Sequence, residues 1–183
     1  MYKKICITNR HLVSGDYFEK IKLVLKSDVD YIILREKDLS EAEYLSLAQQ
    51  VISLAGEKCI LHNFISVAEK LNYDKIHLNM DKFLSLSDNQ KLIFETIGVS
   101  THTIEEALLA EQLGASYITA SHIFATDCKN DLPPRGLNYL SAVKSAVTIP
   151  VYALGGIHPD NQQQCLDAGA DGICMMSEYM KNK

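Results

Sequence analysis

The segment ASHIFATDCKND, residues 120–131, places several reactive side chains directly after an apolar run. His122 comes first, and Thr126, Cys128 and Lys129 follow it. An imidazole can accept a proton and return it near neutral pH, and an ammonium group can bind an anion. The segment is therefore a candidate for proton transfer on an anionic substrate. A structural hydrogen bond would also explain a single histidine at the end of a strand, so the surrounding pattern has to decide.

Other polar side chains also follow short apolar runs along the chain. These runs end in Arg35 and Lys37, in His62 and Asn63, in His77, in Ser100 and His102, and in His122. Side chains alternate along a strand, so Arg35 and Lys37 are expected on one face, where both cations can meet one anion. The bias of histidines towards the ends of apolar runs predicts that these side chains gather at one edge of a sheet.

Two segments near the C-terminus, ALGGIHPDN and MMSEYM, suggest a phosphate site. Glycines let a backbone approach a ligand closely, and backbone amides at turns and helix N-termini bind anions. We expect phosphate to bind chiefly through the amides of Gly156, Met176 and Ser177. A tight turn alone would also explain the adjacent Gly155 and Gly156.

Short apolar segments alternate with longer amphipathic stretches along the whole chain. Eight such units can be distinguished, and the last apolar segment, DGICMMS, is followed only by EYMKNK. Segments rich in Ile and Val are typical of parallel strands buried on both faces. The pattern predicts an α/β fold in which residues 1–183 form one TIM (β/α)8 barrel domain, shortened at its last helix. A doubly wound open sheet is the alternative, although ICITNRHLVSG lacks its usual GxGxxG turn.

In a barrel, the active site lies at the C-terminal ends of the strands, where the polar residues above are found. Helix signals support the repeat: Thr103 can cap a helix, with Glu106 three residues later as in a capping box. Gly114 is expected to end that helix.

The composition excludes several classes of function. A net charge of −5 leaves no basic footprint for nucleic acid. No apolar run approaches the roughly 20 residues needed to span a bilayer, so no membrane partner is expected. The five cysteines form no CxxC pair and no zinc-binding spacing. Their odd number and the lack of a signal peptide predict a cytoplasmic protein, with Cys6, Cys59 and Cys174 as core residues.

The sequence resembles the thiamine phosphate synthase / TenI family over nearly its whole length. The matching segments, in order, are LREK, HL, IGVSTHTIEEALLAEQLGASYI, HIFATDCK, GL, IPVYALGGIHPDN and AGADGICMMS. The resemblance implies a TIM barrel and one of two chemistries. Synthases couple a pyrimidine pyrophosphate to a thiazole phosphate with Mg²⁺, whereas TenI-type proteins are tautomerases that aromatise a carboxythiazole phosphate.

The departures from the family pattern help to choose between these chemistries. Synthases typically have Asn-Asp-Arg after the third strand, and here the aligned residues are His62, Asn63 and Phe64. An Asp typical of the fourth strand is replaced by Lys82, and Asp81 could substitute only with a shift in register. A hard cation that bridges pyrophosphate prefers carboxylate oxygens. We therefore expect no metal site, and no cofactor unless the protein is a synthase that uses Mg²⁺.

The resemblance implies that His122 is the proton carrier of a thiazole tautomerase, since HIFATDCK matches the tautomerase version of this loop. Arg35 and Lys37 are expected to hold the carboxylate end of the thiazole phosphate, with Thr126, Cys128 and Lys129 closing over the ring. Asn63 and Ser100 are further expected substrate contacts. A homodimer is expected from the family. The alternatives are a thiamine phosphate synthase and a non-catalytic regulatory or phosphate-binding barrel.

Overall fold

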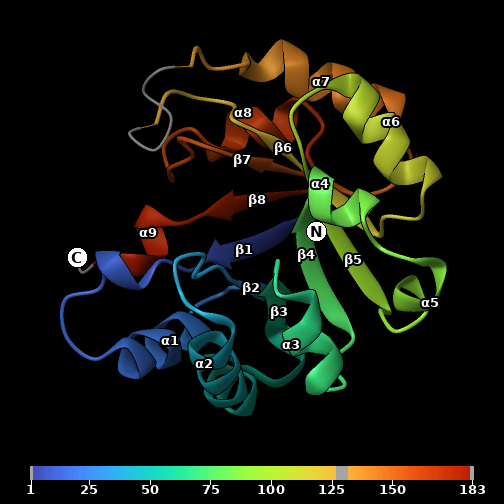
Figure 1. Ribbon diagram of the computed structural model, residues 1–183. Coiled ribbons are helices and arrows are strands. Elements are labelled where there is room, and N and C mark those ends of the chain that lie inside the picture. Colours follow the sequence, from blue (N-terminus) through green and yellow to red (C-terminus); the bar gives the residue numbers. More distant parts are fainter. Residues whose placement is uncertain (1, 127–131, 182–183) are drawn as a thin grey trace.

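A closed barrel of eight parallel strands forms the centre of the molecule (Figure 1). The computed structural model describes residues 2–126 and 132–181. Each strand pairs with the next in sequence, and β8 closes the barrel against β1. The strands are β1 (Lys3–Ile7), β2 (Tyr31–Leu34), β3 (Cys59–His62), β4 (Lys75–Asn79), β5 (Thr96–Thr101), β6 (Tyr117–Ser121), β7 (Val151–Leu154) and β8 (Gly172–Met175). The predicted TIM barrel is confirmed, and the doubly wound sheet is excluded.

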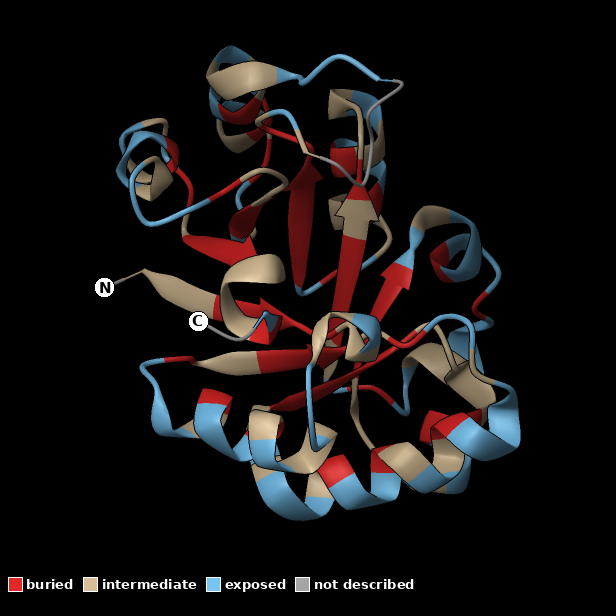
Figure 2. Cartoon of the chain, turned by 90° about the vertical axis from the view of Figure 1, so that its left-hand side faces the viewer, coloured by how far each residue is buried: buried red, intermediate tan, exposed pale blue. Residues whose placement is uncertain are grey.

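Helices follow the strands and cover the outside of the barrel (Figures 1 and 2). The α-helices are α1 (Tyr17–Lys26), α2 (Glu41–Ala55), α3 (Ile65–Lys70), α4 (Met80–Leu84), α5 (Asp88–Lys91), α6 (Ile104–Gln112), α7 (Gly136–Ala146), α8 (Gln162–Asp167) and α9 (Ser177–Met180). Short 3₁₀ turns are η1 (Arg10–Leu12) and η2 (Gly56–Lys58). The helix after β8 has only four described residues, as the sequence predicted. Within the described ranges, no helix is both long and apolar enough to cross a bilayer.

The strands separate two groups of buried side chains. The outward-facing group packs under the helices and contains Cys6, Cys59 and Val99 among many aliphatic residues. The inward-facing group is smaller and fills the barrel with Ile5, Ile7, Ile33, Ile60, Tyr117, Tyr152 and Cys174. This two-sided burial explains why the strands are continuously apolar in sequence. The prediction that Cys6, Cys59 and Cys174 are core residues is confirmed.

The predicted start of α6 is confirmed, with one difference. The Thr103 hydroxyl accepts a hydrogen bond from the amide of Glu106 at 3.0 Å. The Glu106 carboxylate, however, accepts from the amide of His102 at 2.6 Å, one residue before the cap. The helix ends at Gln112, and Gly114 follows with a φ of 92°. The Thr103 cap therefore fixes the loop between β5 and α6, and Gly114 begins the connection from α6 to β6.

Tyr44 on α2 joins the C-terminal ends of two neighbouring strands. Its fully buried hydroxyl donates to the Leu34 carbonyl at 2.6 Å and accepts from the His62 amide at 2.8 Å. Buried backbone groups that lose a partner are costly. This side chain therefore holds the ends of β2 and β3 in register where the barrel opens.

We expect Tyr44→Phe to lower the free energy of unfolding by about 2 kcal/mol, because two buried backbone groups lose a partner. Chemical denaturation measures the change. Tyr31→Phe is the matched control, since the Tyr31 hydroxyl has no hydrogen-bond partner within residues 2–126 and 132–181. The control should change stability by less than about 0.5 kcal/mol. Equal effects of the two substitutions would contradict the role given to Tyr44.

Candidate functional site

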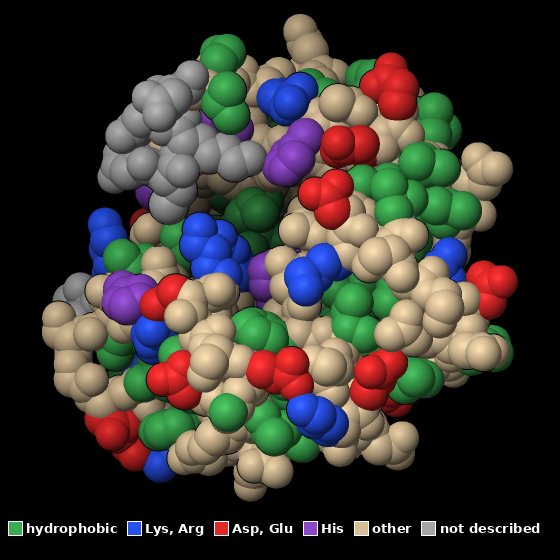
Figure 3. Space-filling view, viewed as in Figure 1, with side chains coloured by type: hydrophobic (Ala, Val, Ile, Leu, Met, Phe, Trp, Pro, Cys, Tyr) green, Lys and Arg blue, Asp and Glu red, His purple; other side chains and the backbone are tan. Residues whose placement is uncertain are grey.

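The C-terminal ends of the strands surround a hollow lined by cations and histidines. Figure 3 shows Lys or Arg side chains and His side chains gathered around this recess. We call this end of the barrel the mouth. Arg35 directly follows β2, and its charge acts on His62 at the end of β3, so Arg35 lies near the mouth. The mouth thus collects side chains that stand far apart in sequence.

Arg35 and Lys37 differ in exposure, since Arg35 is half-buried and Lys37 is exposed. Neither forms an ion pair with a described residue, whereas the nearby Arg10 is paired with Glu36 and Asp38. Both cations therefore remain available to an anion. However, β2 ends at Leu34 and Lys37 lies exposed in the turn that follows, so strand alternation does not extend to Lys37. Strand alternation therefore does not support the expectation that Arg35 and Lys37 share one face.

Glu36, between these cations, has a structural role that the sequence did not reveal. Its buried carboxylate accepts hydrogen bonds from the Thr8 hydroxyl at 2.7 Å and from the Arg10 amide at 3.0 Å. The Tyr17 hydroxyl donates to it at 3.2 Å. Glu36 therefore anchors the loop after β1 to the end of β2, and its oxygens are already occupied by protein donors.

A chain of hydrogen bonds runs across the inner face of β4, β5 and β6. The His77 ring contacts the Ser100 hydroxyl through Nε2 at 2.8 Å and the Tyr117 hydroxyl through Nδ1 at 3.0 Å. Burial lowers the pKa of His77 to about 3, so this ring is neutral at physiological pH. Ser100, a predicted substrate contact, is half-buried at the open end of the chain. The sequence placed His77 at the rim but did not single out Tyr117.

His62 stacks near-parallel on His77, with ring centroids 5.9 Å apart. Burial lowers the pKa of His62 well below its usual value, and the positive charges of Arg35 and Lys82 lower it further. Its Nδ1 is buried without a hydrogen-bond partner among the described residues. The mouth therefore holds two neutral imidazoles beside cationic side chains.

Asn63 has a structural partner in addition to its predicted substrate role. It adopts a positive φ of 62°, and its side-chain oxygen accepts from the Asn79 amide at 2.9 Å. Asn79 in turn caps α4, since its side chain accepts from the Lys82 amide at 2.9 Å. Asn63 and Asn79 thus join the ends of β3 and β4 and start a helix there.

His122 lies directly after β6 and is buried, with 3% of its surface exposed. Its Nε2 is 3.3 Å from the Leu132 carbonyl, and its own carbonyl accepts from the Arg135 amide at 3.0 Å. A carbonyl oxygen only accepts, so Nε2 carries the proton in this contact. Nδ1 is then the nitrogen that can accept a proton in the neutral ring. The contact with Leu132 therefore leaves Nδ1 of His122 available as a proton acceptor.

The expected companions of His122 are only partly described. Thr126 is half-buried at the end of the described segment. Cys128 and Lys129 lie outside the described residues, so their predicted contacts with the ring stay predictions.

The glycine pair after β7 packs directly against the His122 loop. Gly155 has a φ of 103°, and a Cβ there would lie 2.3 Å from the Cβ of His122. Gly156 has a φ of 64°, and a Cβ there would lie 2.3 Å from the Ala125 carbonyl oxygen. The pair is thus required for close packing as well as for the turn. A role in phosphate binding by Gly156, Met176 and Ser177 remains an expectation.

The described residues at the mouth, which leave out 127–131, do not fit the Mg²⁺ that the synthase reaction uses. No group of three or more His, Cys, Asp or Glu side chains in the described parts of the chain could hold a metal ion. Asp81 is exposed on α4, and the Glu36 oxygens are held by Thr8, Arg10 and Tyr17. Asn63, at the position of the family carboxylate, holds β4. The donor set required by a hard divalent cation is therefore missing from the described mouth.

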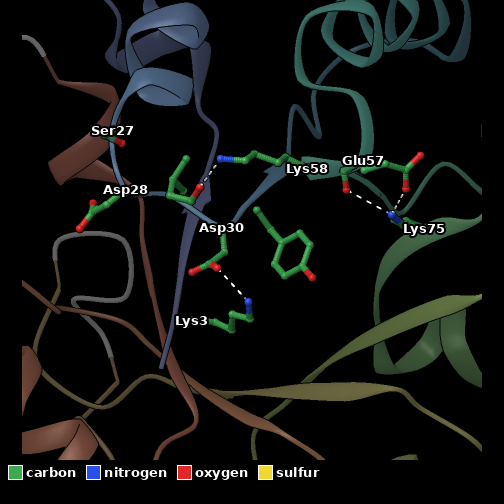
Figure 4. Close-up of a pocket in the computed structure, with 9 residues that line it drawn as sticks. Lys3, Ser27, Asp28, Asp30, Glu57, Lys58 and Lys75 are labelled. Atoms are coloured by element: carbon green, nitrogen blue, oxygen red, sulfur yellow. Dashed lines mark hydrogen bonds and ion pairs between the residues drawn. The ribbon is translucent and has the colours of Figure 1, made fainter. Parts of the chain in front are cut away.

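A separate pocket of about 480 Å³ lies at the opposite end of the barrel (Figure 4). Each of its three lysines has an acceptor. Lys3 forms an ion pair with Asp30 at 2.9 Å, and Lys75 forms one with Glu57. Lys58 donates a hydrogen bond to the Val29 carbonyl at 2.9 Å. None of these lysines is therefore left without an acceptor, as a site for an anion would require. The pocket also lies at the N-terminal ends of the strands, away from the mouth, where barrels place stability rather than chemistry.

Comparisons with known proteins agree on one family. The family model described as thiamine monophosphate synthase (TMP-TENI) matches residues 5–179. A thiamine-phosphate synthase of Shouchella clausii is 36% identical, over 98% of this chain and 88% of that protein. A putative thiamine-phosphate synthase 2 of Aquifex aeolicus is 33% identical, over 96% of each chain. The solved thiamine phosphate pyrophosphorylase of Pyrococcus furiosus superposes with a TM-score of 0.84 at 28% identity, covering 100% of this chain and 89% of its own.

Proposed function

Because the chain belongs to the thiamine monophosphate synthase family, we propose that it is an enzyme of thiamine biosynthesis that acts on a thiazole phosphate. Both chemistries of this family share that substrate class. The names of the relatives favour the synthase, which was the alternative in the sequence analysis. The donor set of the mouth instead favours a reaction without a divalent cation.

We propose thiazole tautomerisation as this reaction. The observation that carries it is the absence of metal-binding carboxylates from the described mouth, combined with a buried histidine whose Nδ1 is free to accept a proton. Aromatisation needs only such proton transfer. No bond to a second substrate forms, so neither pyrophosphate nor a cation to neutralise it is involved.

In the proposed mechanism, His122 removes the proton from the ring carbon that bears the carboxylate. The electron pair moves into the ring, and the exocyclic carbon gains a proton from the same imidazole. Protons and electrons balance without a redox partner. Burial of His122 keeps bulk water away from the exchanging proton.

The remaining residues would bind the two anionic ends of the substrate. Arg35 and Lys37 are proposed for the carboxylate, because neither is neutralised by a described acid. The amides of Gly156, Met176 and Ser177 are proposed for the phosphate, in the loops where barrels often bind phosphate. Asn63, Ser100 and Thr126 are proposed contacts along the ring. The homodimer and the cytoplasmic location also stay predictions.

Removal of divalent cations should leave the proposed reaction unchanged. We expect kcat for aromatisation of the carboxythiazole phosphate to be equal in excess EDTA and in millimolar Mg²⁺. Calorimetric titration with Mg²⁺ should show no saturable binding, because the described residues of the mouth offer no free carboxylate pair. A relative with the family carboxylates is the positive control. Saturable Mg²⁺ binding with EDTA-sensitive turnover would contradict the proposal.

Thiamine phosphate synthase is the second candidate, favoured by the names of the relatives. It predicts that the protein forms thiamine phosphate and releases pyrophosphate from a pyrimidine pyrophosphate and a thiazole phosphate. Under the tautomerase proposal, neither product forms. Assaying both reactions with one preparation separates the two candidates.

A further inference from the structure

A buried hydrogen-bonded group crosses the interior of the barrel below the mouth. Tyr117 on β6, His77 on β4 and Ser100 on β5 are joined by contacts of 3.0 Å and 2.8 Å. Tyr117 and His77 are almost fully buried, and Ser100 is half-buried. We call these three residues the Tyr–His–Ser group. Most buried polar side chains in proteins are hydrogen-bonded, and all three members of this group are.

Gly98 makes the group possible. In the sheet register, His77 lies beside Gly98 and Gly98 lies beside Tyr117. A Cβ at position 98 would lie 2.3 Å from the Tyr117 hydroxyl oxygen and 2.5 Å from Nδ1 of His77. The missing side chain is thus the space through which Tyr117 reaches His77 across the intervening strand. The contact is built by three adjacent strands rather than by chance proximity.

Counting protons fixes the direction of the hydrogen bonds. His77 is neutral and carries one ring proton, so it can donate to only one of its two partners. If Nδ1 held that proton, the Tyr117 hydroxyl proton would lack an acceptor, because Tyr117 has no other hydrogen-bond partner among the described residues. If Nε2 holds it, Tyr117 donates to Nδ1 and Nε2 donates to Ser100. The second arrangement leaves no buried proton unpaired and is favoured.

In this arrangement the Ser100 oxygen accepts two hydrogen bonds. It accepts from His77 Nε2 at 2.8 Å, and the Thr119 hydroxyl also donates to it at 3.4 Å. With both lone pairs engaged, the remaining capacity of Ser100 is its own proton. Because Ser100 lies at the open end of the group, that proton can be donated to a ligand in the mouth.

We propose that Tyr117 and His77 fix Ser100 as a hydrogen-bond donor to an acceptor atom of the anionic ligand in the mouth. Ser100 contacts the ligand, and His77 is a positioning residue that acts through Ser100. The proposal rests on the proposed function only for the identity of the ligand. A donor held in this way favours a ligand with an oxygen or ring nitrogen at that place and disfavours one with an N–H or O–H there.

The ring proton of His77 can be located without any ligand. Long-range ¹H–¹⁵N NMR of histidine-labelled protein distinguishes the two neutral tautomers, and the spectrum of His77→Gln identifies the His77 signals. We expect a neutral ring with the proton on Nε2 between pH 6 and pH 8. A proton on Nδ1, or a charged ring, would overturn the proposal. This result is independent of the enzymatic activity.

A double-mutant cycle tests whether His77 acts through Ser100. Calorimetry with the aromatic carboxythiazole phosphate gives Kd for the wild type, Ser100→Ala, His77→Leu and the double variant. We expect each single variant to raise Kd about 10-fold or more, as for a lost hydrogen bond to a charged group. The double variant should be no weaker than Ser100→Ala alone. If the double variant raised Kd by the product of the two single effects, the proposal would be overturned.

His77→Gln separates positioning from a structural role. Its amide oxygen can accept from Tyr117 and its amide nitrogen can donate to Ser100, so Kd should stay within about 3-fold of the wild type. Circular dichroism checks that each variant is folded. If His77→Gln binds as weakly as a folded His77→Leu variant, the proposal is wrong. If the wild type fails to bind the compound, the proposed function fails while the NMR result still decides this inference.

Discussion

Replacing His122 with alanine is expected to lower kcat for tautomerisation by roughly 10²- to 10⁴-fold, the usual contribution of a general acid–base residue. The substitution removes the imidazole whose Nε2 is held by the Leu132 carbonyl and whose Nδ1 is free to accept the substrate proton. KM should change much less, because His122 is not proposed to hold either anionic end. Steady-state kinetics on the carboxythiazole phosphate measures both constants.

His11→Ala is the matched control for this experiment. His11 is exposed and paired with Asp38 at 2.9 Å, and it has no proposed part in binding or chemistry. An exposed side-chain contact of this kind contributes little to stability, so both kcat and the unfolding midpoint should stay close to the wild type. Unchanged turnover in a folded His122→Ala protein would remove the proposed base.

Gly155→Ala is expected to have the largest effect on stability, roughly 3–5 kcal/mol, and to reduce activity as well. An L-residue at a φ of 103° is strained, and the new Cβ would meet the Cβ of His122 at 2.3 Å. Relief of that clash requires movement of His122 or of the turn after β7. The free energy of unfolding, measured by thermal or chemical denaturation, and kcat should therefore both fall.

Gly114→Ala separates backbone strain from the clash. Gly114 has a φ of 92°, but a Cβ there would have open space around it. Its cost should be about 1–2 kcal/mol from strain alone, with kcat unchanged. Equal losses of stability and activity in the two variants would show that the contact between Gly155 and His122 is unimportant.

The barrel could be predicted from sequence because its signals are repeated and local. Eight apolar segments rich in Ile and Val, each followed by an amphipathic stretch, leave few other arrangements. The Thr103 cap was equally visible, since it depends on residues three apart. The partner of the Glu106 carboxylate could not be predicted in the same way, because the amide of His102, one residue before the cap, competes for it.

The mouth was predicted only in part, because its contacts join residues far apart in sequence. Strand ends gave Arg35, Ser100 and His122, since a barrel brings these ends together. Nothing local shows that Gly98 leaves room for Tyr117 to reach His77.

Residue type was also a weak guide to role. Asn63 was expected to contact substrate, and the structure gives it the Asn79 amide as a partner. Glu36 lies between two proposed ligand-binding cations, yet it anchors the loop after β1.

Incubation of the wild-type protein with carboxythiazole phosphate in D₂O and excess EDTA, followed by ¹H NMR, shows whether the protein transfers the proton without a metal. We expect conversion to the aromatic thiazole, with protium retained at the exocyclic carbon because the buried His122 returns the proton that it removed. A parallel sample with Mg²⁺, pyrimidine pyrophosphate and thiazole phosphate should yield no thiamine phosphate. No aromatisation in the first sample, together with thiamine phosphate in the second, would contradict the account and establish the synthase reaction instead.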